Sequence, residues 1–249
     1  MPGSREKPIE TLNEAAKSET SSPRTQWHRT VFFWILLLAT ILGFSTLTIL
    51  VETTPSFPID LQITQAIQSI DAPSFAWVMR LISWPGFLPQ SVLITLLIGF
   101  TLYMFDFRWE SIAALFTAFI SGVTNESVKY WIQRPRPAAD LVDVFEVLSS
   151  YSFPSGHVMF YTIVFGFVWY LAYTVLKRSV KRTVVLGIFG TLVALVGMSR
   201  IYLGQHWASD VLGAYLLGGL ILAGIILLHR WGKSRFFVHQ SPVSNSDRV

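Results

Sequence analysis

The chain has 249 residues, of which 52% are hydrophobic and only 14% are charged, and its mean hydropathy is +0.49. This composition is too apolar for an ordinary soluble domain, so we interpret the chain as an integral membrane protein. It contains no cysteine, which excludes disulfides, thiol catalysis and cysteine-ligated zinc. The net charge of +4 does not indicate nucleic acid, because most basic residues flank apolar segments, where they determine topology.

The N-terminal region is polar, and residues 1–29 are predicted to form a flexible cytoplasmic tail. The first apolar run starts near residue 30, too far from Met1 for a cleaved signal peptide, so it is interpreted as a retained helix. Six stretches are long enough to cross the hydrocarbon core at about 20 helical residues each. They are 30–51, 90–107, 111–129, 158–176, 183–203 and 209–229.

The predicted fold is therefore all-α: a polytopic membrane protein with six transmembrane helices over residues 30–235, followed by a second flexible tail at 236–249. The third span carries Asn125 and Glu126, and the fifth ends in Ser199-Arg200. Both spans become polar toward one end, so these ends are expected to line a cavity.

Nearly forty residues separate the first two spans, more than a simple connection needs. Between about 60 and 88, apolar residues alternate with Gln, Ser, Asp and Arg, which favours an amphipathic segment in the outer interface. One interpretation is that this segment caps the helix bundle. The other is that it shapes a lateral path for a lipid, with Trp77 and Leu81 as candidates to line it.

Lys and Arg are unevenly distributed between the two sides of the predicted topology. If the N-terminus is cytoplasmic, that side also receives the basic segment 177–182 and the basic residues that follow the sixth span. The opposite side keeps Arg80, Lys129, Arg134, Arg136 and Arg200. We therefore expect both termini in the cytoplasm, in the plasma (inner) membrane, and the polar clusters described next on the extracytoplasmic face.

The first polar cluster is KYWIQRPRP at 129–137, at the end of the third span. The proline after Arg136 stops a helix and extends the chain, which can turn Lys129 and Arg136 toward one anion. Taken alone, such basic residues more often extend toward lipid headgroups. An earlier Arg-Pro pair begins at Arg134, which is therefore a second candidate for contact with phosphate or headgroup.

The second cluster, Pro154-Ser155-Gly156-His157, directly precedes the fourth span. Backbone N–H groups at a helix N-terminus bind anions, and His157 would lie beside them. On its own, the string is also compatible with an ordinary turn and an interfacial histidine.

The third cluster is Ser199-Arg200 followed by His206 and Asp210. His206 and Asp210 are four residues apart, so they share a face if the sixth helix starts near His206. The carboxylate would then fix the imidazole tautomer and leave the other ring nitrogen free to attack phosphorus, and Arg200 would supply a planar fork for phosphate oxygens. A helix cap at Ser209 or Asp210 with an unrelated histidine explains the pattern equally well.

All three clusters fall on the same side of the predicted topology, which makes three separate coincidences improbable. Together they supply cations for a phosphate, two histidines for nucleophile and acid, and a carboxylate to orient a histidine. These are the parts needed for metal-free hydrolysis of a phosphoester. Ionisable residues at membrane depth are costly, which supports a functional interpretation.

With these motifs, the chain resembles the type-2 phosphatidic acid phosphatase family, whose pattern is KxxxxxxRP, PSGH and SRxxxxxHxxxD. The resemblance covers residues 125–213 and, through the six spans, most of the chain outside its tails. It implies that His206 is the nucleophile that forms a phosphohistidine, that Asp210 orients it, and that His157 protonates the leaving alkoxide. It also implies that the phosphate oxygens are held by Lys129, Arg136, Ser155, Gly156 and Arg200.

The resemblance implies a lipid phosphate monoester or pyrophosphate as substrate, such as phosphatidic acid, phosphatidylglycerophosphate or a polyprenyl pyrophosphate. No metal or other cofactor and no nucleic acid partner are expected, and the number of subunits is left open. A vanadate-dependent haloperoxidase shares this kind of oxyanion site, but such enzymes are typically soluble. A lipid or ion transporter is the remaining alternative, and it would not need two histidines around an anion site.

Overall fold

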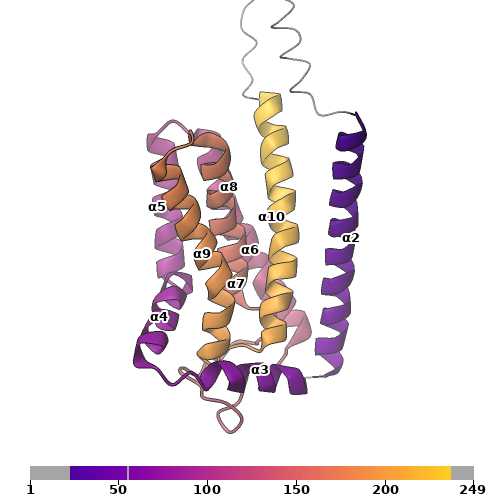
Figure 1. Cartoon of the computed structure of the whole chain (residues 1–249), viewed down its shortest axis with the longest axis vertical. Helices are drawn as coiled ribbons and strands as arrows, with labels where there is room; N and C mark the ends of the chain where they lie inside the picture. Colours follow the sequence, from indigo (N-terminus) through magenta and orange to yellow (C-terminus); the bar gives the residue numbers. More distant parts are fainter. Residues whose placement is uncertain (1–22, 55, 237–249) are drawn as a thin grey trace, which may run out of the picture. The chain divides into compact units, whose positions relative to one another are not determined.

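In the computed structural model, residues 23–54 and 56–236 are described, and every regular element among them is a helix (Figure 1). The chain divides into two compact units, Met1–Leu42 and Gly43–Val249. All three motifs and every helix after α2 (Pro23–Thr53) belong to the second unit. The predicted tails lie mostly outside the described residues. α2 starts at Pro23, since proline is tolerated in a first turn, and its part that is apolar enough to span a membrane starts at Thr30, as predicted for the first span.

Each of the six predicted spans is helical. They correspond to α2, α5 (Gln90–Met104), α6 (Arg108–Ile132), the path from α7 to α8, α9 (Val180–Tyr202) and α10 (Ala208–Phe236). Four of them are long and apolar enough to cross a membrane alone. With its 15 residues, α5 reaches this length only together with α4 (Pro73–Ser83) and the turn after it, across a bend of 62°. The all-α membrane fold is confirmed, and a count of six spans is compatible with it.

The fourth span is the centre of the second unit. It runs from α7 (Gly156–Phe160) through a π-helical turn, η2 (Tyr161–Phe165), into α8 (Gly166–Val175). Of the most apolar stretch of this span, 61% is buried, against 28% of the corresponding stretch in α9 and in α10. The difference arises because α6, α9 and α10 all pack around the fourth span. Single π-helical turns are frequent near functional sites, and this one follows the second motif directly.

The segment between α2 and α5 forms two short helices, α3 (Pro58–Gln68) and α4, and a 3₁₀ turn, η1 (Trp84–Gly86). α4 packs along α9, and α3 contacts both α9 and α10 (Figure 1). The buried face of α3 is polar, with Asp60 and Thr64, whereas Ile59 is exposed. Apolar side chains on the outside are typical of a helix bordered by lipid.

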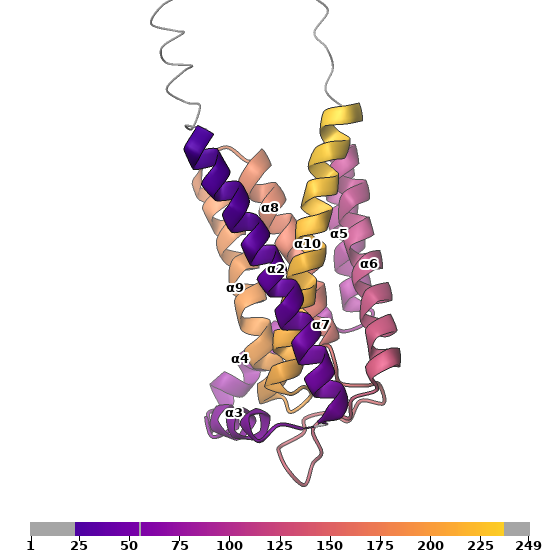
Figure 2. The same cartoon turned by 90° about the vertical axis from the view of Figure 1, so that its right-hand side faces the viewer.

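The motif-bearing ends of four helices meet at one end of the second unit (Figures 1 and 2). Here α6 and α9 end, α7 and α10 begin, and the long connection 133–155 passes between them. The short basic connection between α8 and α9 lies at the opposite end. The structure thus gathers the three clusters at one end, while the face of the membrane on which they lie stays a prediction.

Candidate functional site

His206 lies in the tight connection between α9 and α10. The turn depends on Gly204, whose φ is +64° and where an added Cβ would lie 2.0 Å from the carbonyl oxygen of Asp143. Only glycine adopts this conformation freely, and only glycine leaves room for the neighbouring backbone. The turn places the His206 side chain inside the protein, with 2% of its surface exposed.

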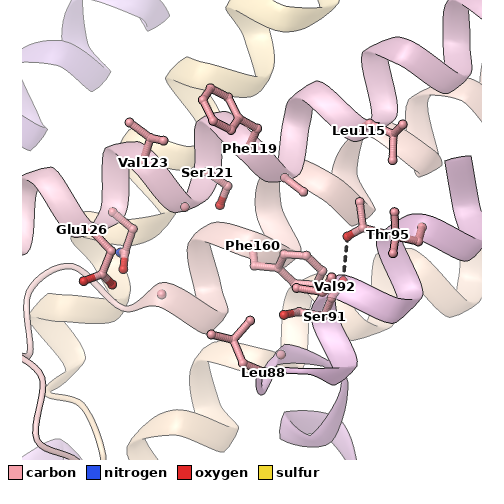
Figure 3. Close-up of a pocket in the computed structure, with 16 residues that line it drawn as sticks. Leu88, Ser91, Val92, Thr95, Leu115, Phe119, Ser121, Val123, Glu126 and Phe160 are labelled. Atoms are coloured by element: carbon pink, nitrogen blue, oxygen red, sulfur yellow. Dashed lines mark hydrogen bonds between the residues drawn. The ribbon is translucent and has the colours of Figure 1, made fainter.

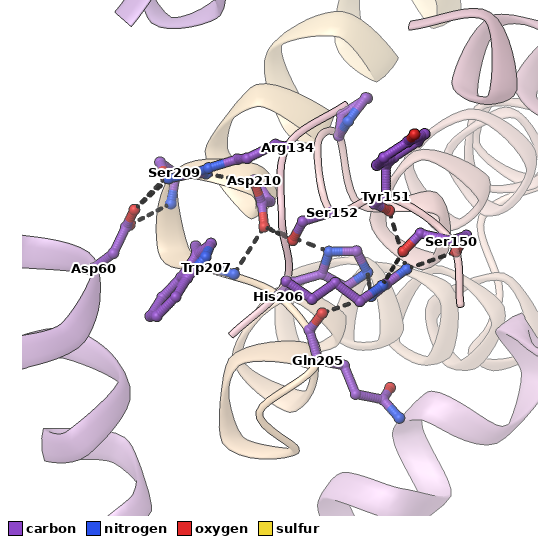
Figure 4. A network of polar contacts seen from close by, with 12 residues as sticks. Asp60, Arg134, Ser150, Tyr151, Ser152, Gln205, His206, Trp207, Ser209 and Asp210 are labelled. Carbon is purple, nitrogen blue, oxygen red and sulfur yellow. Dashed lines mark hydrogen bonds and ion pairs between the residues drawn. The ribbon is translucent and has the colours of Figure 1, made fainter. Parts of the chain in front are cut away.

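The two ring nitrogens of His206 have different neighbours (Figure 4). Nε2 is 3.2 Å from the Arg136 guanidinium, and Nδ1 is 3.6 Å from Oδ2 of Asp210. Because arginine can only donate, Nε2 accepts and Nδ1 carries the proton, which faces the carboxylate. This tautomer leaves Nε2 unprotonated, so the lone pair that accepts from Arg136 can instead attack an electrophile.

His206 is neutral near pH 7. Burial lowers the pKa of His206 well below its usual value, and the positive charges of Arg136, Arg200 and Lys129 lower it further. A neutral imidazole has a free lone pair on the nitrogen that faces these cations. The arrangement therefore suits nucleophilic attack on an anionic phosphoryl group.

Asp210 is fully buried and held by three groups other than His206. It accepts hydrogen bonds from Arg134 at 2.5 Å, from the hydroxyl of Ser152 and from the backbone N–H of Trp207 at 2.8 Å. The distance of 3.6 Å from Oδ2 of Asp210 to Nδ1 of His206 is longer than a hydrogen bond. The carboxylate is thus rigidly placed beside the histidine, where it can stabilise positive charge on the ring.

Arg136 is oriented by the connection before α7 and by the turn before His206. Its guanidinium donates to the carbonyls of Ser150 at 2.6 Å, Gln205 at 2.6 Å and Tyr151 at 3.2 Å, and to the Ser150 hydroxyl at 2.9 Å. These four acceptors lie on two segments of the chain, and together they fix the plane of the guanidinium group. The spacing in the first motif predicted Arg136 as an anion ligand, and the structure places it beside the nitrogen that would attack.

Arg200 and Ser155 supply buried donors without protein partners. Arg200 is completely buried, and one of its nitrogens donates to Ser83 at 2.9 Å. Its Nε and second terminal nitrogen, and the hydroxyl of Ser155, have no hydrogen-bond partner among residues 23–54 and 56–236. Buried donors left unsatisfied are costly, so these groups point to an anion as their partner.

Lys129 lies next to the start of α7. A Cβ added to Gly156 would lie 3.8 Å from its Nζ and 3.0 Å from the amide oxygen of Asn125, so both side chains border this backbone. Asn125 also donates to the carbonyl of Pro154 at 3.0 Å, which ties α6 to the second motif. Nζ of Lys129 is 3.6 Å from Oε1 of Glu126. The same ammonium group can contact an anion that binds at the N-terminus of α7.

His157 is positioned by the turn after α4, which the motifs did not reveal. A Cβ on Gly86 would lie 2.3 Å from the His157 ring, so the close approach requires glycine. The ring of Phe87 packs edge-on against His157, with centroids 4.6 Å apart, and its face lies 5.3 Å from the Arg200 guanidinium carbon. The only sequence signal for these contacts is a Trp-Pro-Gly turn, which occurs in many contexts.

An apolar groove of about 620 Å³ ends at this site (Figure 3). α5 and α6 form its walls, and Asn125, Glu126 and Gly156 lie at its polar end, as expected for the end of the third span. Segment 60–88 contributes Gly86 and Leu88 to its lining, from the turns that follow α4. Trp77 and Leu81 are exposed and are not among the lining residues of this groove, so a role for them on a lipid path stays a prediction.

The geometry defines a class: a helical membrane protein in which a buried histidine lies beside Arg136 and feels the positive charges of Arg200 and Lys129, an arrangement suited to an anion. The model of the PAP2 superfamily matches residues 110–234, which include all three motifs. The chain belongs to this superfamily, as the motifs of the type-2 phosphatidic acid phosphatases indicated.

Two curated relatives carry enzyme names. Phosphatidylglycerophosphatase B of Bacillus subtilis is 34% identical over 167 residues, which cover 65% of this chain and 79% of the relative. An undecaprenyl-diphosphatase of Sulfolobus acidocaldarius is 36% identical over 106 residues, 41% of this chain and 47% of the relative.

Two crystal structures share the fold. The transmembrane PAP2 type phosphatidylglycerolphosphate phosphatase from Bacillus subtilis superposes with a TM-score of 0.70 and 29% identity, over 80% of this chain and 98% of that one. Aquifex aeolicus LpxE gives a TM-score of 0.53 and 25% identity, over 70% and 96% of the two chains.

Proposed function

We propose that this protein is a membrane phosphatase that hydrolyses a lipid phosphate monoester or pyrophosphate through a phosphohistidine. The observation that carries the proposal is Nε2 of His206, 3.2 Å from Arg136, in a site where buried donors of Arg200 and Ser155 have no hydrogen-bond partner among the described residues. The names of the relatives, a phosphatidylglycerophosphatase and an undecaprenyl-diphosphatase, support this substrate class.

The reaction has two steps. Nε2 of His206 attacks phosphorus, the bond from phosphorus to the lipid oxygen breaks, and its electron pair stays on that oxygen, which takes a proton from the protonated form of His157 and leaves His157 neutral. Asp210 stabilises the positive charge on the phosphorylated ring. His157 then accepts a proton from water as the water attacks the phosphohistidine, which releases phosphate and restores neutral His206.

The charges at the site support a mechanism without metal. Lys129, Arg136 and Arg200 offer three positive charges to the phosphoryl oxygens, and charge-assisted hydrogen bonds from such donors are strong in a buried site. Mg²⁺ prefers carboxylate and water oxygens, whereas the groups around Nε2 of His206 are cations that would repel it.

The groove between α5 and α6 favours a lipid over a soluble phosphate. Its apolar walls lead to Gly156, so an acyl or prenyl chain can lie in the groove while the headgroup reaches His206. Burial of a chain contributes about 0.8 kcal/mol per methylene, which a soluble phosphate forgoes. The Lys and Arg distribution supports a site on the extracytoplasmic face of the plasma membrane, with both termini cytoplasmic.

The proposal is tested by phosphate release from detergent-purified protein over a panel of phosphatidic acid, phosphatidylglycerophosphate, a polyprenyl pyrophosphate and glycerol 3-phosphate. We expect release from at least one lipid, little from glycerol 3-phosphate, and none from His206→Ala. Lack of release from every lipid, or full activity of His206→Ala, would contradict the proposal. The same panel separates a phosphatase from a transporter, which releases no phosphate.

A further inference from the structure

Helix α3 reaches the site through Asp60, a residue outside the three motifs. Asp60 is 1% exposed, although it lies in the first turn of an interfacial helix. One carboxylate oxygen accepts from the backbone N–H of Ser209 at 2.8 Å, and the other accepts from the Ser209 hydroxyl at 2.5 Å and from Arg134 at 2.9 Å. Burial of an aspartate is costly unless its charge is paired and hydrogen-bonded. The three hydrogen bonds to Asp60 offset this cost, and their role in the site needs an explanation.

Arg134 connects Asp60 to the site (Figure 4). Its second terminal nitrogen donates to Asp210 at 2.5 Å and to Ser209 at 2.7 Å. Arg134 is therefore shared by two carboxylates in a chain from Asp60 to Asp210, which ends 3.6 Å from Nδ1 of His206. Both terminal nitrogens of Arg134 donate to carboxylates, which does not favour the contact with phosphate or headgroup that the earlier Arg-Pro pair also allowed.

The charges of Asp60, Arg134 and Asp210 do not cancel. Two carboxylates face one guanidinium, so with both carboxylates ionised the cluster has a net negative charge next to a ring that becomes positive when phosphorus bonds to it. Without the charge of Asp60, Arg134 would have Asp210 as its one carboxylate partner in the cluster and would neutralise it. The carboxylate of Asp60 thus draws part of the arginine's charge away from Asp210.

We propose that Asp60 is a positioning residue for the reaction: through Arg134, it holds Asp210 in the place and charge state in which Asp210 stabilises phosphorylated His206. The inference rests on the proposed function, because it concerns the same histidine. It assigns α3 a role in chemistry in addition to any role as a cap on the bundle.

Gln68, at the other end of α3, provides a matched control. Its side-chain amide donates to the carbonyls of Asp143 at 2.7 Å and Tyr202 at 2.9 Å, and its oxygen accepts from the Asp143 backbone at 3.1 Å. Gln68 therefore docks α3 onto the connection before the second motif and the end of α9, but it has no contact with Arg134 or Asp210 in the described chain.

The test compares Asp60→Asn with Gln68→Ala, each purified in detergent and assayed with the best lipid phosphate of the panel. We expect Asp60→Asn to lower kcat by about 10- to 100-fold, the range typical for outer partners of an active-site group, with KM changed by less than about twofold. Gln68→Ala should lower the thermal unfolding midpoint at least as much, with a far smaller loss of kcat. In an Asp210→Asn background, Asp60→Asn should cause little further loss, because both act through one carboxylate.

Equal losses of kcat in Asp60→Asn and Gln68→Ala, in step with their unfolding midpoints, would overturn the inference and leave the proposed function intact. So would full additivity with Asp210→Asn. If Asp60→Asn does not fold, Asp60→Glu keeps the charge but displaces it by one methylene; it should lower kcat and leave KM unchanged, and unchanged kcat would contradict the inference. Lack of phosphate release by the wild-type protein would contradict the proposed function itself.

Discussion

Substitution of Gly122 by phenylalanine should block the lipid groove without disturbing the fold. Gly122 lies on α6 and lines the groove, and an added Cβ there meets no atom within 4 Å. A larger side chain therefore fits, and in a helix interior any residue but proline replaces glycine without loss of helix propensity. The ring would occupy space that we assign to the substrate chain.

The expected loss of kcat/KM follows from the volume of the groove that the phenylalanine ring occupies. If it excludes about three methylenes of the lipid chain from a groove of about 620 Å³, the loss of burial at about 0.8 kcal/mol each is about 2.4 kcal/mol. At 1.4 kcal/mol for each factor of ten, kcat/KM for a long-chain lipid phosphate should fall by about 50-fold. Hydrolysis of p-nitrophenyl phosphate, which has no chain, should stay within about twofold of the wild-type value.

The assay measures kcat/KM for both substrates in the same mixed micelles. Gly187→Phe is the matched control, because Gly187 is an exposed glycine of α9 whose added Cβ also meets no atom within 4 Å, and it lies outside the groove. The control should hydrolyse both substrates normally. Equal activity of Gly122→Phe toward both substrates would refute the assignment of the groove to the lipid chain.

Four further predictions address the chemistry and the topology. His157→Ala should impair a lipid phosphate more than p-nitrophenyl phosphate, whose leaving group needs little protonation; equal losses would argue against its role as acid. Since burial and then the positive neighbours lower the pKa of His206, the acid limb of the pH profile should lie below pH 6.5, and Arg136→Gln should move it upward; a downward shift would refute this. Activity should survive EDTA and be inhibited by vanadate, whereas strict dependence on Mg²⁺ would count against the mechanism. Phe145→Cys and Val180→Cys should react with an impermeant thiol reagent from opposite sides of the membrane, and labelling of both from outside would contradict the topology.

The sequence predicted most of the site because its residues are unusual in their surroundings. Lys129, Arg136 and His206 interrupt or flank apolar runs, where charge is costly, and their spacing places them at helix ends. The six helical segments were predictable for the same reason, since apolar runs of this length leave few alternatives to helices. The helix start at Pro23 was not, because polar residues continue a helix beyond its apolar part without a change in hydropathy.

The supporting contacts were not predictable. Asp60 and Arg134 are 74 positions apart, and no local pattern distinguishes a buried aspartate in α3 from a solvated one on an interfacial helix. The close approach of Gly86 to His157 joins two turns that only the packed bundle brings together. The walls of the groove were not predictable either, because α5 and α6, which form them, show apolar residues on several faces.

The most direct test of the account is the identity of the residue that carries phosphate during turnover. The protein is mixed with a lipid phosphate labelled at phosphorus, quenched within milliseconds under alkaline conditions that preserve phosphohistidine, and digested for peptide mapping. We predict that the label is found on His206 and that it is absent from His206→Ala. Label on any other residue, or phosphate release with no labelled protein at any quench time, would contradict the account.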